Sequence, residues 1–312
     1  MTLAYFLRLV CLCLACLGVV QVIAGLAVAV LAHRAISIAS RLPAVSAASL
    51  LLTLRLLPAG AGLFATLGLC LPSYLWLEED SAAEPVGWLC LAAATLGALF
   101  LAAGLIRAAR AVARSPHIRS TLKIQIDAED CCVVDSTQPV FALTGVFRSR
   151  LLLSSSVMQT LSANELSVAL SHEVAHRNSR DNMKRLLLRL TPVPVSGLDR
   201  AWSKFAEWAA DDAAVSGDPD RSLALASALV RFARLTAPGA GDSLGSYLLG
   251  SCLLEHEFDL TTRVERLLAV PVAAAKSSSR ILWLVIAAGS IAALVNPASL
   301  AAVHNLLESL IN

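Results

Sequence analysis

Two histidines and a glutamate stand together near the middle of the chain, as His172-Glu173-Val174-Ala175-His176. On an α-helix, residues four apart lie one above the other on the same face, so His172 and His176 can direct two imidazoles at one ion. In this His-Glu-x-x-His pattern the two histidines bind zinc, and the glutamate lies beside the water that the metal holds. Glu173 is therefore expected to act as a general base, as such a glutamate does in metalloproteases.

The surrounding segment, residues 161–182, is predicted to form the helix that this spacing needs. Ser162 and Glu165 match a capping box, in which a serine and a glutamate three residues apart close the first turn of a helix. The segment is apolar enough to be buried. Buried imidazoles and carboxylates without partners cost free energy, and a bound metal ion would offset that cost. The alternative is that so short a pattern arises by chance and binds no metal.

A catalytic zinc site usually has three protein ligands and leaves one position for water. We expect Glu207 to be the third ligand, on a second predicted helix that is rich in alanine and aromatic residues. The stretch between His176 and Glu207 is long enough for a turn and an antiparallel return. Asp211, one turn further along, would accept the second ring N–H of a zinc-bound histidine and fix its orientation. The alternative is that Glu207, Asp211 and Asp212 form a solvated helix face.

The combination of His-Glu-x-x-His with Glu-x-x-x-Asp resembles the gluzincin group of zinc metallopeptidases. Within that group the chain resembles the BlaR/MecR family of membrane metallopeptidases, which act in beta-lactam sensing. The segments that carry this resemblance are residues 140–154, Glu165-Leu166, the motif helix, Arg180-Asp181-Asn182 and residues 263–268. The resemblance covers residues 140–268 and the layout of the membrane spans. The HtpX/Ste24 type of membrane protease shares the zinc pattern and is the nearest alternative.

The BlaR/MecR resemblance implies three membrane spans, a cytoplasmic zinc domain and a fourth span, in the inner membrane of a bacterial cell. The gluzincin resemblance implies that an edge strand beside the zinc pairs with the backbone of an extended substrate. Receptors of the BlaR/MecR family carry an extracellular penicillin-binding sensor after the last span. Here residues 298–312 fit only a short amphipathic helix. This difference argues against beta-lactam sensing by the chain, and a membrane partner would have to supply the input for signalling.

The composition of the chain is that of a membrane protein. Of its 312 residues, 57% are hydrophobic and 15% are charged, whereas about a quarter of the residues in soluble domains are charged. Crossing a bilayer takes about 20 apolar residues. The predicted spans are residues 4–31, 47–76, 86–106 and 281–296. A signal peptide is the alternative for the first span, and a re-entrant hairpin around Pro58 is the alternative for the second.

The distribution of charge predicts how the spans are oriented. Basic residues gather after the first span, after the third and before the fourth, whereas the loop after the second span is acidic. The positive-inside rule places the N-terminus and the acidic loop outside and the zinc domain in the cytoplasm. The net charge of +2, without a basic stripe that includes aromatic residues, gives no indication of direct binding to nucleic acid.

The predicted fold is a mainly α membrane protein with an α+β gluzincin-like zinc domain inserted between the third and fourth of four transmembrane helices. Its parts are a membrane domain (1–115), a zinc metallopeptidase domain (116–278), and a fourth span with a short tail (279–312). The zinc domain is expected to contain a further helix at residues 222–233 and a small sheet. The strands are predicted at residues 122–126, 131–134, 140–143 and 150–153, with the last two joined through Thr144-Gly145. One of them is expected to pair with an extended peptide substrate, and an ordinary sheet without that role is the alternative.

Two residues near the end of the zinc domain are candidates for contact with the substrate. His256 and Arg263 fall where HtpX/Ste24-type proteases carry a histidine and an arginine near the substrate carbonyl, although the spacing differs. Either could stabilise the oxyanion that forms during peptide hydrolysis. His256 lies between two glutamates and fits a surface position equally well. Arg263 fits equally well as the partner of a carboxylate that holds the domain together.

These observations predict an integral-membrane zinc endopeptidase with one catalytic Zn²⁺, which cuts a protein or peptide substrate. Regulatory proteolysis of a cytoplasmic transcriptional repressor is the role that the BlaR/MecR resemblance implies. One alternative is a quality-control protease of the HtpX/Ste24 type. Another is a signalling scaffold in the membrane that does not cut, although Glu173 argues against it because a scaffold needs no general base.

Overall fold

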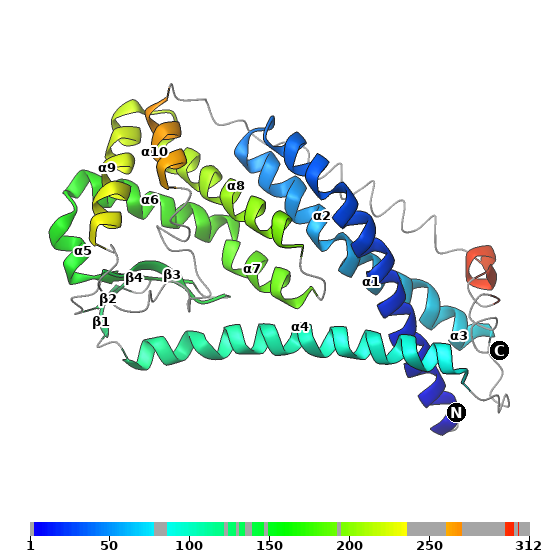
Figure 1. Cartoon of the computed structure of the whole chain (residues 1–312). Helices are drawn as coiled ribbons and strands as arrows, with labels where there is room; N and C mark the ends of the chain where they lie inside the picture. The colour runs from blue at the N-terminus through cyan, green and yellow to red at the C-terminus, as the bar shows by residue number, and fades with distance from the viewer. Residues whose placement is uncertain are drawn as a thin grey trace.

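The structure is a computed structural model that describes residues 3–77, 86–121, 124–128, 131–134, 139–146, 149–191, 195–235, 260–269, 297–302 and 305. This part of the chain is mostly helical and contains one small sheet, so the predicted mainly α architecture is confirmed for it. Figure 1 shows long helices that cross one another, and a group of shorter helices that gathers beside the sheet.

Three helical segments are long and apolar enough to cross a bilayer, and they correspond to the first three predicted spans. They are α1 (Leu3–Ala39), the run of α2 (Ala44–Phe64), π-helix η1 (Ala65–Cys70) and α3 (Leu71–Leu77), and α4 (Trp88–Thr121). The second segment is helical throughout, with Pro58 inside α2, and forms no re-entrant hairpin. The fourth predicted span, residues 281–296, lies outside the described residues.

Helix α1 packs against both α2 and α4, and small residues allow the contact with α4. Gly18 of α1 faces Gly97 of α4, and a Cβ atom added at Gly97 would lie 2.0 Å from the carbonyl oxygen of Leu14. Any larger side chain there would force the two backbones apart. Close approach through small residues is typical of helices in a bilayer, where the hydrophobic effect does not drive helix against helix.

The sheet has the strand order β1-β2-β4-β3, which makes β3 an edge strand. Its strands are β1 (Ile124–Ala128), β2 (Cys131–Val134), β3 (Phe141–Thr144) and β4 (Arg150–Ser154). Strands β3 and β4 form the predicted antiparallel hairpin, with Phe141 opposite Leu153, whereas β2 pairs with β4 in parallel. Gly145 follows β3 with φ 94°, a conformation that glycine adopts without steric cost.

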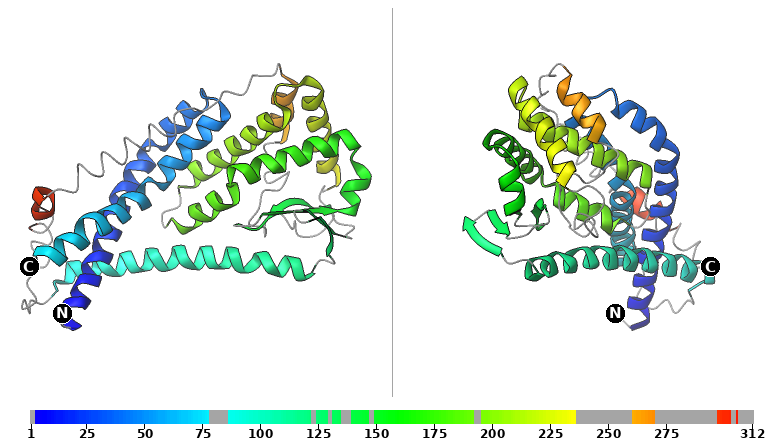
Figure 2. Two further views of the ribbon diagram at one scale, coloured as in Figure 1. Left: turned by 180° about the vertical axis from the view of Figure 1, so that it is seen from behind. Right: turned by 60° about the vertical axis from the view of Figure 1, so that its left-hand side comes forward.

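The helices beside the sheet are α5 (Ser155–Thr160), α6 (Ala163–Ser179), α7 (Asp181–Leu190), α8 (Ser196–Val215), α9 (Pro219–Leu235) and α10 (Leu260–Leu268). Helix α6 contacts α8 and α9, and α10 contacts α9 (Figure 2). The core between α6, α9 and the sheet is apolar and includes Phe141, Val168, Leu225, Leu229 and Phe232. Contacts with this core fix the position of α6.

Helix α8 contacts both the long apolar helices and the group of helices beside the sheet. Trp202 and Phe205, in its middle, are buried in a cluster that also contains residues of α1 and α2. Near the start of α8, Asp199 Oδ1 accepts a hydrogen bond from Arg55 Nε of α2 at 2.6 Å. Arg55 is buried, so this pairing compensates the desolvation of its charge. The part of α8 that precedes Glu207 is therefore fixed to the long apolar helices.

The last described residues lie far from α10. Helix α10 contacts α9 in the group of helices beside the sheet. Leu300 is buried near α3 instead, and its carbonyl oxygen accepts a hydrogen bond from Ser73 Oγ at 3.1 Å. Figure 1 shows α10 and this short helical segment at opposite ends of the molecule.

Candidate metal centre

Helix α6 carries the His-Glu-x-x-His motif, and local interactions fix both of its ends. At its start the predicted capping box is confirmed, because Glu165 N donates to Ser162 Oγ at 3.3 Å and Ser162 N donates to Glu165 Oε2 at 2.8 Å. At its end Arg180 adopts the left-handed conformation, with φ 55° and ψ 41°. That conformation costs a residue with a side chain about 1–2 kcal/mol, and it turns the chain sharply into α7.

Three side chains from α6 and α8 converge on one point inside the protein. His172 Nε2 and His176 Nε2 lie 3.1 Å apart. Glu207 places Oε2 at 3.5 Å from His172 Nε2 and Oε1 at 3.4 Å from His176 Nε2. All three side chains are buried, and together they form a group that can hold a metal ion. The structure thus brings together the three residues predicted as ligands.

Each imidazole is held by a carboxylate on its other side. His172 Nδ1 lies 3.0 Å from Asp211 Oδ1, as predicted, and His176 Nδ1 lies 2.7 Å from Asp181 Oδ2. A carboxylate that accepts the Nδ1 proton leaves the Nε2 lone pair free to face a ligand. The two Nε2 atoms and the Glu207 carboxylate then face one another as three acceptors. Such a cluster is stable only with a proton or a metal ion between its members.

Arginines surround the carboxylates of α8. Arg263 of α10 donates to Asp211 through Nε and Nη2 at 2.9 and 2.7 Å, and its Nη1 lies 3.1 Å from Glu207 Oε2. Arg185 Nη2 of α7 lies 3.5 Å from Glu207 Oε1. Of the two roles considered for Arg263, the structure shows the pairing with carboxylates. His256, the other candidate for contact with the substrate, lies outside the described residues.

The pKa values of both histidines are raised. Burial lowers the pKa of His172, but its contacts with Asp211 and Glu207 outweigh this effect and raise the pKa above its usual value. Burial also lowers the pKa of His176, but the charge of Glu207 and the hydrogen bond to Asp181 raise it to about 10. Without a metal, the centre therefore binds a proton on His176 at neutral pH.

The pKa values of Glu207 and Asp211, the two carboxylates of α8 that contact the imidazoles, are lowered. Burial raises the pKa of Glu207, but the charge of His176 and a hydrogen bond from His172 hold it well below its usual range. Burial likewise raises the pKa of Asp211, but Arg263 and His172 lower it to about 2. Both groups are therefore ionised at neutral pH, and the ionised Glu207 attracts a cation to the space beside the imidazoles.

Glu173 and the end of the edge strand lie next to the centre. Glu173 is buried on α6, and its charge is one of the causes that raise the pKa of His176. Helix α6 contacts β3. At the start of α7, Asn182 Nδ2 donates to the carbonyl oxygens of Leu143 and Gly145 at 3.1 and 2.8 Å. The end of β3 is therefore fixed to the turn that follows the motif helix.

Comparison of the chain with models of known protein families, with curated proteins and with solved structures gives no match. The resemblance to the BlaR/MecR metallopeptidases therefore stays a prediction that rests on sequence motifs. A functional assignment has to rest on the residues of the centre and on their geometry.

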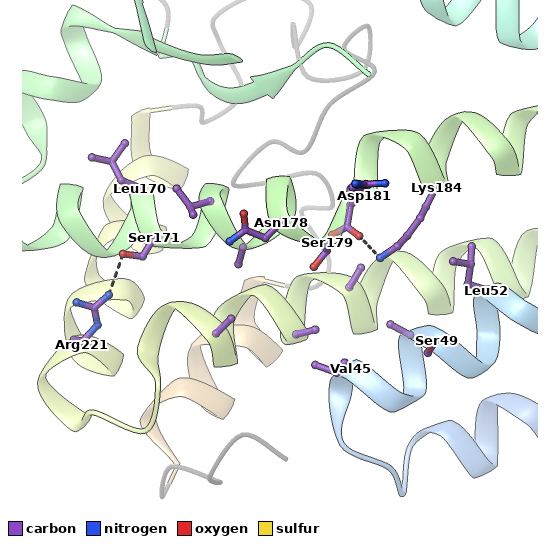
Figure 3. A pocket seen from close by; sticks show the side chains of 17 residues that line it. Val45, Ser49, Leu52, Leu170, Ser171, Asn178, Ser179, Asp181, Lys184 and Arg221 are labelled. Carbon is purple, nitrogen blue, oxygen red and sulfur yellow. Dashed lines mark hydrogen bonds and ion pairs between the residues drawn. The ribbon is translucent and has the colours of Figure 1, made fainter. Parts of the chain in front are cut away.

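A pocket of about 1060 Å³ lies on the other side of α6 (Figure 3). Its α6 residues include Ser171, Val174 and Asn178, which helical spacing places on the face opposite His172 and His176. The start of α2, the start of α7 and α8 form its other walls. None of the three candidate ligands lines this pocket, so a substrate bound there would not meet them.

Two residues that complete the centre, Asp181 and Arg185, were not predicted from the sequence. Helical spacing gives no signal for Asp181, because a residue five positions after His176 would lie off the ligand face if the helix continued. The left-handed turn at Arg180 returns Asp181 to His176. The resemblance to the BlaR/MecR family singles out Arg180-Asp181-Asn182 but assigns these residues no role. Arg185 follows one turn later on α7 and reaches Glu207 for the same reason.

Proposed function

We propose that the chain is an integral-membrane zinc endopeptidase that hydrolyses peptide bonds of a protein or peptide substrate. One observation carries this proposal. His172 Nε2 and His176 Nε2 lie 3.1 Å apart at one buried point, and the two carboxylate oxygens of Glu207 lie 3.5 and 3.4 Å from them, one oxygen beside each imidazole. Glu173 follows the first ligand on the same helix.

The residues present fit a zinc ion. Two imidazoles and one carboxylate are a ligand set of catalytic zinc, and they leave a fourth position for water. Bonds of about 2.0–2.1 Å in tetrahedral geometry place the ligand atoms about 3.3 Å from one another. The separation of the two Nε2 atoms, and the distance from each Nε2 atom to the Glu207 oxygen beside it, are close to this value. Zinc bound there would supply a Lewis acid for the scissile carbonyl and lower the pKa of a bound water towards 7.

The other tasks of the reaction fall to side chains around the ligands. Glu173 would accept a proton from the attacking water and pass it to the nitrogen of the leaving amine. Asp211 and Asp181 hold the two imidazoles in fixed orientations, and Arg263 holds Glu207 and Asp211. Groups that are already oriented need no reorganisation while the reaction proceeds, which lowers its barrier.

The substrate would bind as an extended peptide along β3. Support for this part of the proposal comes from the position of β3 at the edge of the sheet and from its contact with α6. An edge strand has backbone N–H and C=O groups that can pair with an added strand. Such pairing recognises the peptide backbone and makes few demands on sequence.

We further propose that the chain belongs to a family of the BlaR/MecR type. It would lie in a bacterial inner membrane, with its zinc domain on the cytoplasmic side. The motif segments support the family, and the basic residues after the third span and before the fourth predicted span support the orientation. Helix α10 and the short helical segment at residues 297–302 lie at opposite ends of the molecule, which supports a fourth crossing between them. A cytoplasmic repressor is the substrate that the resemblance suggests, with a membrane partner as the source of the signal.

The experiment that tests the proposal compares cells that carry the wild type, Glu173→Ala or Asp220→Ala. Asp220 is an exposed carboxylate on α9 and serves as the matched control. Loss of the general base should slow cleavage about 10²–10⁴-fold. In a survey of protein N-termini, at least one cleavage product should be present with the wild type and Asp220→Ala and absent with Glu173→Ala.

The metal content of the same three purified proteins separates loss of catalysis from loss of the site. All three should contain equal amounts of zinc, because Glu173 is not a ligand. The proposal would be wrong if the purified Glu173→Ala protein, with its zinc in place, cut the identified substrate at the wild-type rate.

A further inference from the structure

Helix α7 has the residue pattern of a helix that lies in a membrane surface. Four of its five apolar side chains fall on one face, and its basic side chains fall on the other. The apolar face consists of Met183, Leu186, Leu187 and Leu190, and the basic residues are Lys184, Arg185 and Arg189. None of the four apolar side chains is fully buried, and Leu187 is 41% exposed. An amphipathic helix with a basic polar face inserts its apolar side between lipid headgroups and acyl chains.

The end of α7 lies beside the candidate span Trp88–Ala113 of α4. A Cβ atom added at Gly104 of α4 would lie 2.3 Å from the carbonyl oxygen of Leu190. Arg107 Nη2 donates to the carbonyl oxygen of Thr191 at 2.9 Å. The apolar part of a bilayer takes about 20 helical residues, and counted from Trp88 it ends near Arg107. The last turn of α7 is therefore level with the last apolar turn of α4.

The candidate span that contains α2 places the start of α8 at the same level. Leu188 of α7 packs against a buried cluster that contains residues of α1, α2 and α8. Asp199, at the start of α8, pairs with Arg55 of α2. Arg55 lies about 20 residues from Trp76 at the far end of that span, so it too marks the limit of the apolar layer. Helices α4 and α2 thus agree on where the hydrocarbon boundary passes.

We propose that Leu187 and its apolar neighbours on α7 contact the acyl chains of the bilayer, at the end of the spans nearest the metal centre. This inference rests on the membrane location in the proposed function and not on the proposed catalysis. Although α7 packs against α4, Leu187 remains exposed. At this depth a membrane-spanning helix is surrounded by lipid. Burying a leucine side chain stabilises by about 1.5–3 kcal/mol, and acyl chains supply that burial here.

The contact would attach the metal centre directly to the membrane surface. Asp181 and Arg185 belong to α7 and contact His176 and Glu207. Helix α7 has 10 residues, which corresponds to a length of about 15 Å. The centre therefore lies close to the hydrocarbon boundary, and the class of substrate that best fits this position is a polypeptide segment that lies next to the membrane.

Photo-crosslinking in native membranes tests the inference with the full chain. A benzophenone amino acid is introduced by codon suppression at one of three exposed leucines, namely Leu187, Leu99 or Leu223. Leu99 lies within the candidate span of α4 and is the positive control. Leu223 lies on α9 and is the negative control, and both controls are 61% exposed. After irradiation, mass spectrometry of the purified protein detects covalent lipid adducts.

We expect lipid adducts at positions 99 and 187 and none above background at position 223. Adducts at position 99 with none at 187 would overturn the inference and leave the membrane location intact. Adducts at all three positions would overturn it as well, because contact with lipid would then not be specific to α7. No adducts at position 99 would contradict the membrane location itself, and the inference with it. None of these outcomes depends on catalytic activity. The lipid contact of α7 can therefore be disproved without disproving the proposed peptidase function.

Discussion

At the residue scale, a proton and a bound metal ion would compete for the same imidazoles. The pKa of His176 is raised to about 10 and that of His172 is also raised, so the metal-free centre holds a proton at neutral pH. A metal ligand must be a neutral imidazole, so metal binding releases this proton. The affinity for metal must therefore rise with pH for as long as the pH lies below the raised pKa.

We expect the affinity of the metal-free protein for Zn²⁺ to rise about tenfold per pH unit from about pH 6.5 to about pH 8.5, the slope for release of one proton. Competition with a chelator of known affinity, at several pH values, measures this slope. The variant Asp181→Asn removes a negative charge that holds the proton on His176, so its slope should flatten at a lower pH. An affinity that does not change with pH would contradict the competition between proton and metal.

The sequence predicts those contacts of the centre that follow from helical spacing. The two motif histidines share a helix face, and Asp211 lies one turn after Glu207. Contacts between separate elements cannot be predicted from helical spacing. Asp181 reaches His176 because the chain turns at Arg180, and a left-handed arginine has no sequence signal comparable to that of glycine.

At the element scale, α7 is positioned by its close approach to α4. A Cβ atom at Gly104 would lie 2.3 Å from the carbonyl oxygen of Leu190, whereas nothing lies within 4 Å of a Cβ atom at Gly60 of α2. We expect Gly104→Ala to displace α7 and to lower the free energy of unfolding by about 1–3 kcal/mol, the range for overpacking. Gly60→Ala, the matched change on an open helix surface, should leave stability unchanged or raise it.

Thermal unfolding of the two glycine variants in one detergent measures this difference. Because α7 carries Asp181 and Arg185, Gly104→Ala should also weaken zinc binding, and Gly60→Ala should not. Equal effects of the two substitutions on stability would contradict the close packing of α4 and α7.

The helices, the strands and the β3–β4 hairpin were largely predictable from the sequence, but the other contacts between elements were not. The hairpin of β3 and β4 follows from two short apolar runs around Thr144-Gly145. The parallel pairing of β2 with β4 depends on the packing of the whole sheet against α6 and α9, which no local pattern encodes. The continuous helix through Pro58 likewise depends on neighbouring helices, because a proline removes a backbone hydrogen bond that the surroundings must make up for.

At the scale of the whole molecule, α8 connects the spans to the metal centre. One end of the helix is fixed to α2 by the pair of Arg55 and Asp199, and Glu207 lies two turns further along. A shift of α2 would therefore move a ligand. A protein that bound to α2 and shifted it would therefore act on the centre through α8.

We expect Asp199→Ala to lower the free energy of unfolding by about 2–3 kcal/mol, because it leaves the buried Arg55 without its carboxylate. The estimate is below the value for a fully buried pair because Asp199 is 36% exposed. The double variant Arg55→Met with Asp199→Met removes both charges and should recover most of the loss. Arg200→Ala, at the adjacent exposed position, is the control.

Thermal unfolding and zinc affinity of these variants are measured together. Asp199→Ala should weaken zinc binding as well as stability, since it loosens the helix that carries Glu207. If Asp199→Ala behaved like Arg200→Ala in both measurements, the pair with Arg55 would not be what fixes α8 to the spans.

The most direct measurement of the central claim is zinc X-ray absorption spectroscopy together with metal analysis of the purified full chain. For the wild type we expect about one zinc per chain, with nitrogen and oxygen ligands at about 2.0–2.1 Å and an imidazole signal from two histidines. His172→Ala and His176→Ala should each lose most of the zinc, and Glu207→Ala should lose the carboxylate ligand. A wild-type protein without bound zinc after reconstitution, or variants that keep the wild-type spectrum, would contradict the claim that these three side chains hold one ion.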